Sequence, residues 1–538
     1  MSWIQTVPME ELEKKGRVVV RNGARQFALM KMNGRVFALD NRCPHEGYPL
    51  SEGTVSIQDC VLTCNWHNWK FSLNTGENIS GEDNVTVYET KQESGKVWIH
   101  VPELPKDVLL DRSIRQLKKA FENQSYDRMV RELARMHFHQ LDPLCAVRKG
   151  MEWSWQKLEY GMDHAYAVTA DWLVFYGEFK EIDKRLICLS ESLDYLAETS
   201  LRQREFSYTT NQMDFTTDAF LQAIEKEDEE TAIAMVNGAL ADGLHFSDME
   251  ESFTQAALLH YQDFGHSLIY VSKISRLIDS LGLDMEAFLL PSLVRSICSA
   301  AREDLLPEFR KLQGSAGVPP QRSAGVPPAL GAADVSSALN SNELFGKSVD
   351  FCLNWVVEKS KEHSPEEIYD ALLQANAKNL LHFDMSFQFN YENTVSANVG
   401  WLDFTHGLTF ANAVRLQCTK FPRLWKFGLL QMACFSGRNH KYLDPNVLES
   451  DWIVPDRDLF FEQGVEQILD HGKSTPIFAA HYVKTFLAVR TEVNFASESC
   501  TKYMLAALNR YFHSPLKEKH VRRTVLQALD LVGLDYSE

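Results

Sequence analysis

The chain has 538 residues, of which 45% are hydrophobic and 24% are charged, and its formal net charge at pH 7 is −18. At about 150 residues per domain this length predicts three or four domains, and the acidity argues against nucleic-acid binding and against docking on an anionic membrane. The ten cysteines are dispersed, no apolar run approaches the ~20 residues of a membrane span, and the start lacks the pattern of a secretory signal. We therefore expect a cytoplasmic protein with reduced thiols, and neither nucleic acid nor a membrane as a partner.

Residues 1–106 are predicted to be rich in β-strand. The alternating stretches RVVVRNG, QFALMKMNGRVFALD, VTVYET and KVWIHV are separated by Asn and Gly residues that suit tight hairpins. After Pro105, apolar residues recur at three- and four-residue spacing, as in LLDRSIRQLKKAFE and DRMVRELARMH, which indicates helices. The fold class expected is a multidomain α+β protein, with an N-terminal β domain followed by a large, mostly α-helical domain.

The helical region is expected in two parts, 107–312 and 340–538. Between them, within 313–339, SAGVPPQR is followed directly by SAGVPPAL. A near-repeat rich in Pro, Gly and Ala has too few large apolar side chains for a core, so we interpret it as a flexible insert.

The two helical parts also resemble each other, which suggests an internal duplication. LHFSDM (244–249) precedes DFGHSLIYVSKISRL (263–277), and LHFDM (381–385) precedes DFTHGLTFANAVRL (403–416). Each copy holds a His-Phe pair, then an Asp-Phe-x-His run, then an Arg. Repeated helical units of this kind usually pack against one another.

Two pairs of metal-ligating side chains stand out in the β-rich region. CPHEGYPL holds Cys43 and His45, and CNWHNWKF holds Cys64 and His67. Two loops that each supply a thiolate and an imidazole can hold a dinuclear iron–sulfur cluster, in which one iron takes the two Cys and the other takes the two His. Zinc also accepts a Cys₂His₂ set, so a zinc site is the alternative at this point.

The residues around these pairs resemble the Rieske [2Fe–2S] family over residues 1–106. They are Gly47, Pro49 and Leu50 after the first pair, and Trp69, Phe71, Thr75 and Gly76 after the second. The resemblance implies a small β-sandwich with one [2Fe–2S] cluster at its tip, bound by the two Cys and the two His, with the His edge facing solvent or a partner.

Three positions refine the resemblance. Tyr48 and Trp66 stand where the respiratory branch of the family has disulfide-forming cysteines, so the chain is similar to the ferredoxin and oxygenase branch. Asn68 stands where the family commonly has glycine. The reduction potential is expected toward the lower end of the Rieske range of about −150 to +300 mV.

The helical region carries candidate catalytic residues in its repeated runs. Asp263 with His266, and Asp403 with His406, are each three apart and would share one face of a helix. Further ligands for a second site are His245, His260 and His382, and additional candidates in apolar helical stretches are His164, His471 and His481. Facing helices with such side chains can hold a metal. A pocket for acid–base chemistry and purely structural Asp–His pairing are the alternatives that stay open.

The oxygenase pattern itself is incomplete. Rieske oxygenases bind a mononuclear iron with two His and one carboxylate, in the form Asp-x-x-His with a second His about five positions later. Val271 and Ala411 stand at that place in the two copies, and the region is helical, so the ring-hydroxylating oxygenase fold is not expected. The Asp-Phe-x-His helices resemble, over a few positions, the questin oxidase-like helical family, which joins oxygen chemistry to His-bearing helices. No residue role follows from that resemblance.

Three functions are compatible with these features. The leading hypothesis is a Rieske iron–sulfur oxidoreductase that passes electrons from a reductase or ferredoxin through the cluster to a second metal or an organic cofactor in the helical domain. That site would either activate oxygen, as in a monooxygenase, or reduce an organic substrate. Its small-molecule substrate is unknown, and a homo-oligomer stays open. The alternative is an electron-transfer or redox-sensing protein whose helical region is a docking or dimerisation scaffold. The third is a cofactor-independent helical enzyme with a regulatory Rieske domain.

Overall fold

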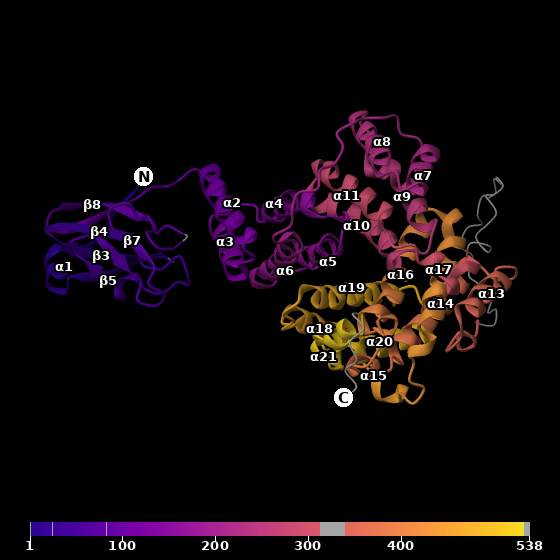
Figure 1. Cartoon of the computed structure of the whole chain (residues 1–538). Coiled ribbons are helices and arrows are strands. Elements are labelled where there is room, and N and C mark those ends of the chain that lie inside the picture. The colour runs from indigo at the N-terminus through magenta and orange to yellow at the C-terminus, as the bar shows by residue number, and fades with distance from the viewer. Residues whose placement is uncertain (1, 24, 82, 313–338, 532–538) are drawn as a thin grey trace. The chain divides into compact units, whose positions relative to one another are not determined.

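The structure, a computed structural model, describes residues 2–23, 25–81, 83–312 and 339–531. The chain divides into two units, Met1–Ala120 with Ser125–Asp142, and Phe121–Gln124 with Pro143–Glu538. Figure 1 shows the strands of the first unit and the helices of the second. The insert expected at 313–339 lies, except for Leu339, outside the described residues.

The first unit contains two antiparallel sheets, which confirms the predicted β domain. Its strands are β1 (Ser2–Pro8), β2 (Arg17–Asn22), β3 (Arg25–Met32), β4 (Arg35–Asp40), β5 (Thr54–Ser56), β6 (Val61–Thr63), β7 (Lys70–Ser72), β8 (Val87–Glu93) and β9 (Lys96–Val101). The larger sheet has the order β1-β9-β8-β4-β3-β2 and the smaller sheet the order β5-β6-β7. A short helix, α1 (Met9–Lys15), follows β1 and was not predicted.

The hairpin between β3 and β4 shows why these residues form this sheet. Asn33 and Gly34 at its tip have positive φ angles of 48° and 76°. A two-residue turn with both φ angles positive matches the right-handed twist of the flanking strands. It sets the register in which Met32 faces Arg35 and Phe27 faces Asp40.

Strand β3 is buried on both faces and joins two apolar clusters. Phe27 and Leu29 face one cluster, with Val97 and Ile99 of β9. The other cluster contains Ala28 and Met30 of β3 together with Leu62, Phe71, Cys43 and Cys64. The two cysteines of the predicted cluster are therefore anchored in the core at the end of the smaller sheet.

Helices begin soon after the last strand, as the sequence predicted. Helix α2 (Lys106–Glu122) and helix α3 (Tyr126–Phe138) are amphipathic, and all but the end of α2 belongs to the first unit. Arg128 of α3 donates a hydrogen bond of 2.9 Å to Asp83, next to the β8 end of the larger sheet. The first unit therefore extends past the expected boundary at residue 106 and includes this helical pair.

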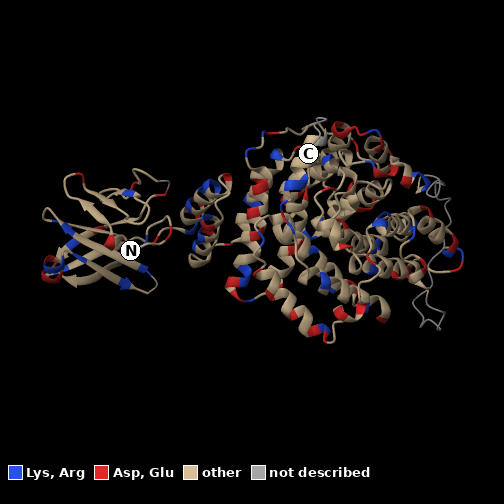
Figure 2. Cartoon of the chain, turned by 60° about the horizontal axis from the view of Figure 1, so that its bottom comes forward, with Lys and Arg blue, Asp and Glu red and all other residues tan. Residues whose placement is uncertain are grey.

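The second unit is mostly helical in its described residues, with loops between the helices. Its helices are α4 (Leu144–Ser154), α5 (His164–Glu178), α6 (Ile182–Ser200), α7 (Thr217–Glu225), α8 (Glu229–Ala241), α9 (Phe246–Leu258), α10 (His266–Leu281), α11 (Glu286–Cys298), α13 (Val349–Lys359), α14 (Pro365–Leu381), α15 (Met385–Phe389), α16 (Trp401–Lys420), α17 (Trp425–Arg438), α18 (Arg457–Leu469), α19 (Pro476–Glu492), α20 (Glu498–His513) and α21 (Val521–Leu531). Lysine, arginine, aspartate and glutamate are interspersed over these helices (Figure 2).

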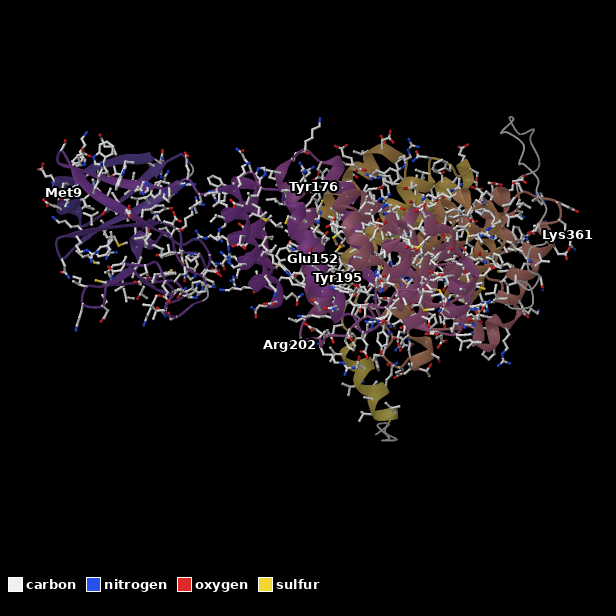
Figure 3. All side chains as sticks on the ribbon, turned by 90° about the horizontal axis from the view of Figure 1, so that it is seen from above. Met9, Glu152, Tyr176, Tyr195, Arg202 and Lys361 are labelled. Carbon is white, nitrogen blue, oxygen red and sulfur yellow. The ribbon has the colours of Figure 1, made fainter. Side chains whose placement is uncertain are left out.

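Four of these helices form the centre of the second unit. Helix α5 packs against α10 and α19, and α16 packs against the same two helices, so the four close a ring. Most residues of α5, α10, α16 and α19 are buried on every side. A helix that is apolar all round belongs in a core. Figure 3 shows how densely side chains occupy the helical unit. Within the described ranges, no helix combines the length and apolar character of a membrane span.

Candidate metal centres

Two loops of the first unit have the same backbone hydrogen bonds, although they differ by one residue in ligand spacing. In the first loop, Cys43 N donates to Tyr48 O and Gly47 N donates to Cys43 O, both at 2.8 Å. In the second loop, Cys64 N donates to Trp69 O at 2.8 Å and Asn68 N donates to Cys64 O at 3.0 Å. Each loop thus turns back at its cysteine and projects its histidine from the tip.

The fourth residue after each cysteine explains how the turns close. Gly47 has a φ of 78° and Asn68 a φ of 60°. Asparagine is among the few residues with a side chain that enter this left-handed region readily. Asn68 therefore adopts the turn for which the family commonly uses glycine.

The four candidate cluster ligands converge in the structure. His45 Nδ1 and His67 Nδ1 are 3.0 Å apart, and their ring centroids are 4.5 Å apart. Cys43 and Cys64 are buried, and burial, with a smaller contribution from Cys64, raises the pKa of the Cys43 thiol to about 12. Since iron binds the thiolate, a thiol this reluctant to ionise would be held deprotonated by the metal. Two thiols on the buried side of the site and two imidazole nitrogens at the loop tips fit a [2Fe–2S] cluster of the Rieske type.

Aromatic rings frame the histidine edge of this site. The Trp69 ring stacks on His45 at a centroid distance of 4.6 Å, and the Trp66 ring lies 5.9 Å from His67. The His67 side chain is 39% exposed and Trp66 is 61% exposed. The histidine edge of the site is therefore open to solvent, whereas the cysteine side is closed by the core.

The second unit brings four histidines together at the centre of its helix ring. His164 is the first residue of α5 and His266 the first residue of α10, while His406 and His481 lie in the second turns of α16 and α19. His266 Nε2 lies 2.8 Å from His406 Nε2, and Lys484 Nζ lies 3.1 Å from the same His406 atom. Helix packing, rather than local sequence, collects these side chains.

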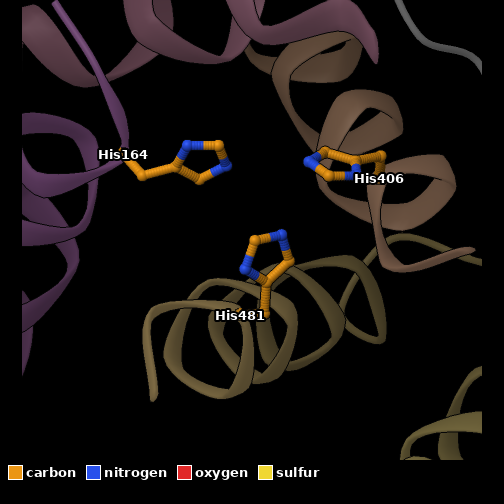
Figure 4. Close-up of side chains that lie close together, drawn as sticks. All are labelled: His164, His406 and His481. Atoms are coloured by element: carbon orange, nitrogen blue, oxygen red, sulfur yellow. The ribbon is translucent and has the colours of Figure 1, made fainter. Parts of the chain in front are cut away.

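The geometry of three of these rings fits a metal ion. One nitrogen each of His164, His406 and His481 lies within 4.8 Å of the other two, and Figure 4 shows the three rings turned toward a common space from separate segments. Imidazole nitrogens on one ion with bonds of about 2.1 Å lie within about 4.2 Å of one another. A small rotation of the rings would bring them onto an ion, and His266 is close enough to be a fourth ligand, with its ring centroid 4.4 Å from that of His164.

The same histidines have nitrogens that the protein does not satisfy. His164 Nε2, His406 Nδ1 and His481 Nε2 are buried and have no hydrogen-bond partner within the described part of the chain. An unsatisfied buried polar atom costs about 1–3 kcal/mol, so such atoms are normally bound to water, an ion or a ligand. The carbonyl of Ile477 also orients the His481 side chain, because His481 Nδ1 lies 2.7 Å from Ile477 O. The other nitrogen, Nε2, is left free to bind a ligand among the four helices.

Burial keeps these groups neutral. Desolvation lowers the pKa of His164, His406 and His481 well below the ordinary histidine value. Desolvation also lowers the pKa of Lys484 well below its usual value. Neutral imidazole is the form that binds a metal.

The two aspartates of the repeated runs have different roles. Asp263 Oδ2 lies 3.2 Å from His266 Nδ1 and orients that ring, as carboxylates commonly do for metal-binding histidines. Asp403 instead accepts a hydrogen bond of 2.8 Å from Gly400 N and caps the start of α16. Asp403 was predicted to be a catalytic residue paired with His406; the hydrogen bond described for its carboxylate instead joins it to its own helix terminus.

The first run is also not helical where a helix was expected. Asp263 and Phe264 have positive φ angles of 45° and 50° and lie in a short turn before α10. The predicted stripe with His260 is therefore wrong. His260 lies outside any helix and bonds to Asp304 at 3.1 Å and to Glu225 at 2.6 Å.

The other two histidines proposed for the second site lie elsewhere as well. His245 precedes α9 and pairs with Glu286 at 2.8 Å, whereas His382 follows α14 and lies 3.0 Å from Asp444 O. One begins a helix and the other ends one, so the His-Phe pairs are not equivalent in the structure. His471 likewise is bound at 3.0 Å to Glu191. These histidines already have protein partners.

Of the predicted residues, His266, His406, His164 and His481 share the site, and Lys484 was missed. The only sequence signal for Lys484 is its position three residues after His481, on the same face of an apolar helix.

Comparison with known proteins assigns the first unit. The family model for the Rieske [2Fe–2S] domain matches residues 2–91, and it extends no further along the chain. The ferredoxin component of the alkene monooxygenase system of Xanthobacter autotrophicus is 38% identical over 87 residues, which are 16% of this chain and 70% of the relative. The oxygenase subunit of 3-chlorobenzoate-3,4-dioxygenase of Comamonas testosteroni is 30% identical over 19% of this chain and 28% of its own length.

Solved structures also align with about a fifth of this chain, and one example is a ferredoxin. The ferredoxin of carbazole 1,9a-dioxygenase from Nocardioides aromaticivorans IC177 aligns with 19% of this chain and 100% of its own, at 15% identity and a TM-score of 0.18. The matched region supports one [2Fe–2S] cluster rather than zinc. Through residues 2–91, the chain belongs to the Rieske [2Fe–2S] family.

Proposed function

We propose that this chain is an oxidoreductase in which a Rieske cluster passes electrons to a metal ion held by His164, His266, His406 and His481. The cluster would be bound by Cys43, His45, Cys64 and His67, and an external reductase or ferredoxin would reduce it. The substrate is a small organic molecule, and oxygen is the expected co-substrate.

The convergence of four imidazoles in the core of the helical unit is the observation that carries this proposal. Structural histidines in the same unit are paired with carboxylates, as His471 is with Glu191 and His245 with Glu286. In contrast, three histidines of the central ring have nitrogens with no partner among the described residues. Imidazole ligands suit iron, copper and zinc. Iron or copper would supply a redox-active centre that accepts electrons one at a time.

The residues around the ring would hold the ligands in place. Asp263 orients His266, and the carbonyl of Ile477 orients His481. The surrounding helices exclude water, since His406 and His481 are only 5% and 1% exposed. A dry, preorganised ligand set strengthens every electrostatic interaction within it.

The similar proteins support the electron-transfer role proposed for the Rieske unit. The compared proteins include a ferredoxin component of a monooxygenase system and an oxygenase subunit of a dioxygenase. A Rieske cluster transfers electrons singly and needs an acceptor, and the helical unit offers one.

Metal analysis of the full chain, purified without oxygen, tests the proposal. We expect the two irons of the cluster and one further metal ion per chain. His406→Gln should lose the further ion and keep the electron paramagnetic resonance signal of the cluster. After chemical reduction, the unmodified chain should consume oxygen faster than His406→Gln.

Two irons per chain, with no other metal or organic cofactor, would contradict this function. That result would favour the alternative, in which the helical unit is a docking or dimerisation scaffold for an electron carrier or redox sensor.

A further inference from the structure

The turn before α10 has a left-handed backbone over three consecutive residues. Asp263, Phe264 and Gly265 have consecutive positive φ angles of 45°, 50° and 75°. A left-handed conformation is unfavourable for a residue with a Cβ, and most of all for a bulky one such as phenylalanine. Such backbone persists only where the surrounding structure imposes it.

Close packing against the helix of His406 explains the glycine. A Cβ added to Gly265 would lie 2.4 Å from the ring of Phe410 on α16. The turn therefore lies directly against the helix that carries His406, and any side chain at position 265 would push the two apart.

An ion pair from two other segments holds the turn. Glu303 Oε2 accepts a hydrogen bond of 3.0 Å from Phe264 N, and Glu303 Oε1 accepts one of 2.9 Å from Arg438 Nη1. The Arg438 guanidinium also lies over the Phe264 ring, with its Cζ 4.1 Å from the ring centroid, and donates to the Tyr261 hydroxyl at 2.7 Å. The Glu303–Arg438 ion pair thus contacts both the backbone and the side chain of Phe264.

This turn also places two side chains, those of Phe264 and Asp263, beside the histidine cluster. Phe264 lies 5.8 Å from the His406 ring, between centroids, and Asp263 contacts His266. Since His266 begins α10 directly after the turn, the direction in which α10 starts depends on these three residues.

We propose that Glu303 and Arg438 are positioning residues for the candidate metal site, which hold the left-handed turn so that Asp263, Phe264 and His266 face the histidine ring. This inference rests on the proposed function. Among the interactions of the described residues, no hydrogen bond or ion pair joins Glu303 or Arg438 to the four histidines, so both act through the turn. Loss of the interaction should loosen the turn and weaken metal binding about tenfold, as commonly happens when the residues that orient metal ligands are changed.

The test uses the full chain with its Rieske cluster and Co(II) as the probe. Co(II) binding is measured by equilibrium dialysis with elemental analysis, and amide hydrogen exchange of the turn is measured without added metal. Glu303→Gln should raise the Kd for Co(II) about tenfold and speed the exchange of the Phe264 amide. The matched control is Glu229→Gln, which weakens a half-buried ion pair with Arg295 in the same unit, 2.8 Å long, and should leave both values unchanged.

A second variant guards against misfolding. Arg438→Lys keeps a charge beside Glu303 but loses the planar contact with Phe264, so it should give a smaller change in the same direction. Wild-type exchange in Glu303→Gln, or faster exchange with an unchanged Kd, would overturn the positioning role alone. A wild-type chain that binds no more Co(II) than His406→Gln would overturn the proposed function, and the positioning role with it.

Discussion

The two candidate metal centres are built in opposite ways. In the Rieske unit, each loop supplies a Cys and a His within four residues, and its own backbone hydrogen bonds shape the turn. In the helical unit, each of four helices supplies one histidine, and only the packing of α5, α10, α16 and α19 brings them together. Local sites leave a sequence pattern, whereas a site assembled by packing leaves isolated residues in apolar helices.

The largest expected effect separates the two centres. Cys64→Ser removes a thiolate ligand, and because a Rieske cluster needs all four ligands, the visible absorption and paramagnetic signal of the cluster should disappear. The metal of the helical unit should stay, since the two units fold around separate cores. Elemental analysis measures both outcomes. Cys60→Ser, a change at a neighbouring cysteine, is the control that should retain the cluster, and simultaneous loss of the helical metal would argue against independent sites.

Removal of one helical histidine should have the next largest effect. His164→Ala deletes a ligand whose Nε2 has no protein partner in the described ranges, and metal affinity should fall at least about 100-fold because a ligand costs more than the residues that orient it. His471→Ala removes a histidine bound to Glu191 and should leave metal affinity unchanged. Equal metal content in the two variants would contradict the assignment of the ring.

The equivalent aspartates of the repeated runs give a sharper comparison. Asp263→Asn should weaken metal binding about tenfold, because the amide holds His266 less strongly than the carboxylate. Asp403→Asn should leave metal binding unchanged and lower the free energy of unfolding by about 1 kcal/mol, since it weakens the cap of α16. Metal titration and denaturant unfolding distinguish the two effects. A loss of metal in Asp403→Asn would restore the symmetric interpretation of the duplication.

The smallest effect is expected at Asn68 in the second Rieske loop. Asn68→Ala places a residue with a Cβ and no compensating local bonds in left-handed backbone and should destabilise the unit by about 1–2 kcal/mol. Asn68→Gly should be at least as stable as the unmodified protein. The denaturant midpoint for loss of cluster absorbance reports both. If alanine is tolerated as well as glycine, the turn does not depend on the φ of this residue.

The sequence alone determined the Rieske half of the protein. The Cys-x-His and Cys-x-x-His pairs, the Asn33–Gly34 hairpin and the alternating strands are all encoded within short windows, because turns and loop sites depend on neighbouring residues. The start of α2 close to Pro105 and the helical character of the second unit were also correctly predicted.

Tertiary structure decided which side chains meet in the helical half. Similar runs around Asp263 and Asp403 take different conformations, because Glu303 and Arg438 hold one in a left-handed turn and α16 continues through the other. His260 and His382 looked like ligands in the sequence but are bound to other side chains or backbone, whereas His164 and His481 meet only through helix packing. The physical reason is that the hydrogen-bond partners of a buried histidine come from distant segments. Which of its nitrogens has no partner can therefore be recognised only in the assembled core.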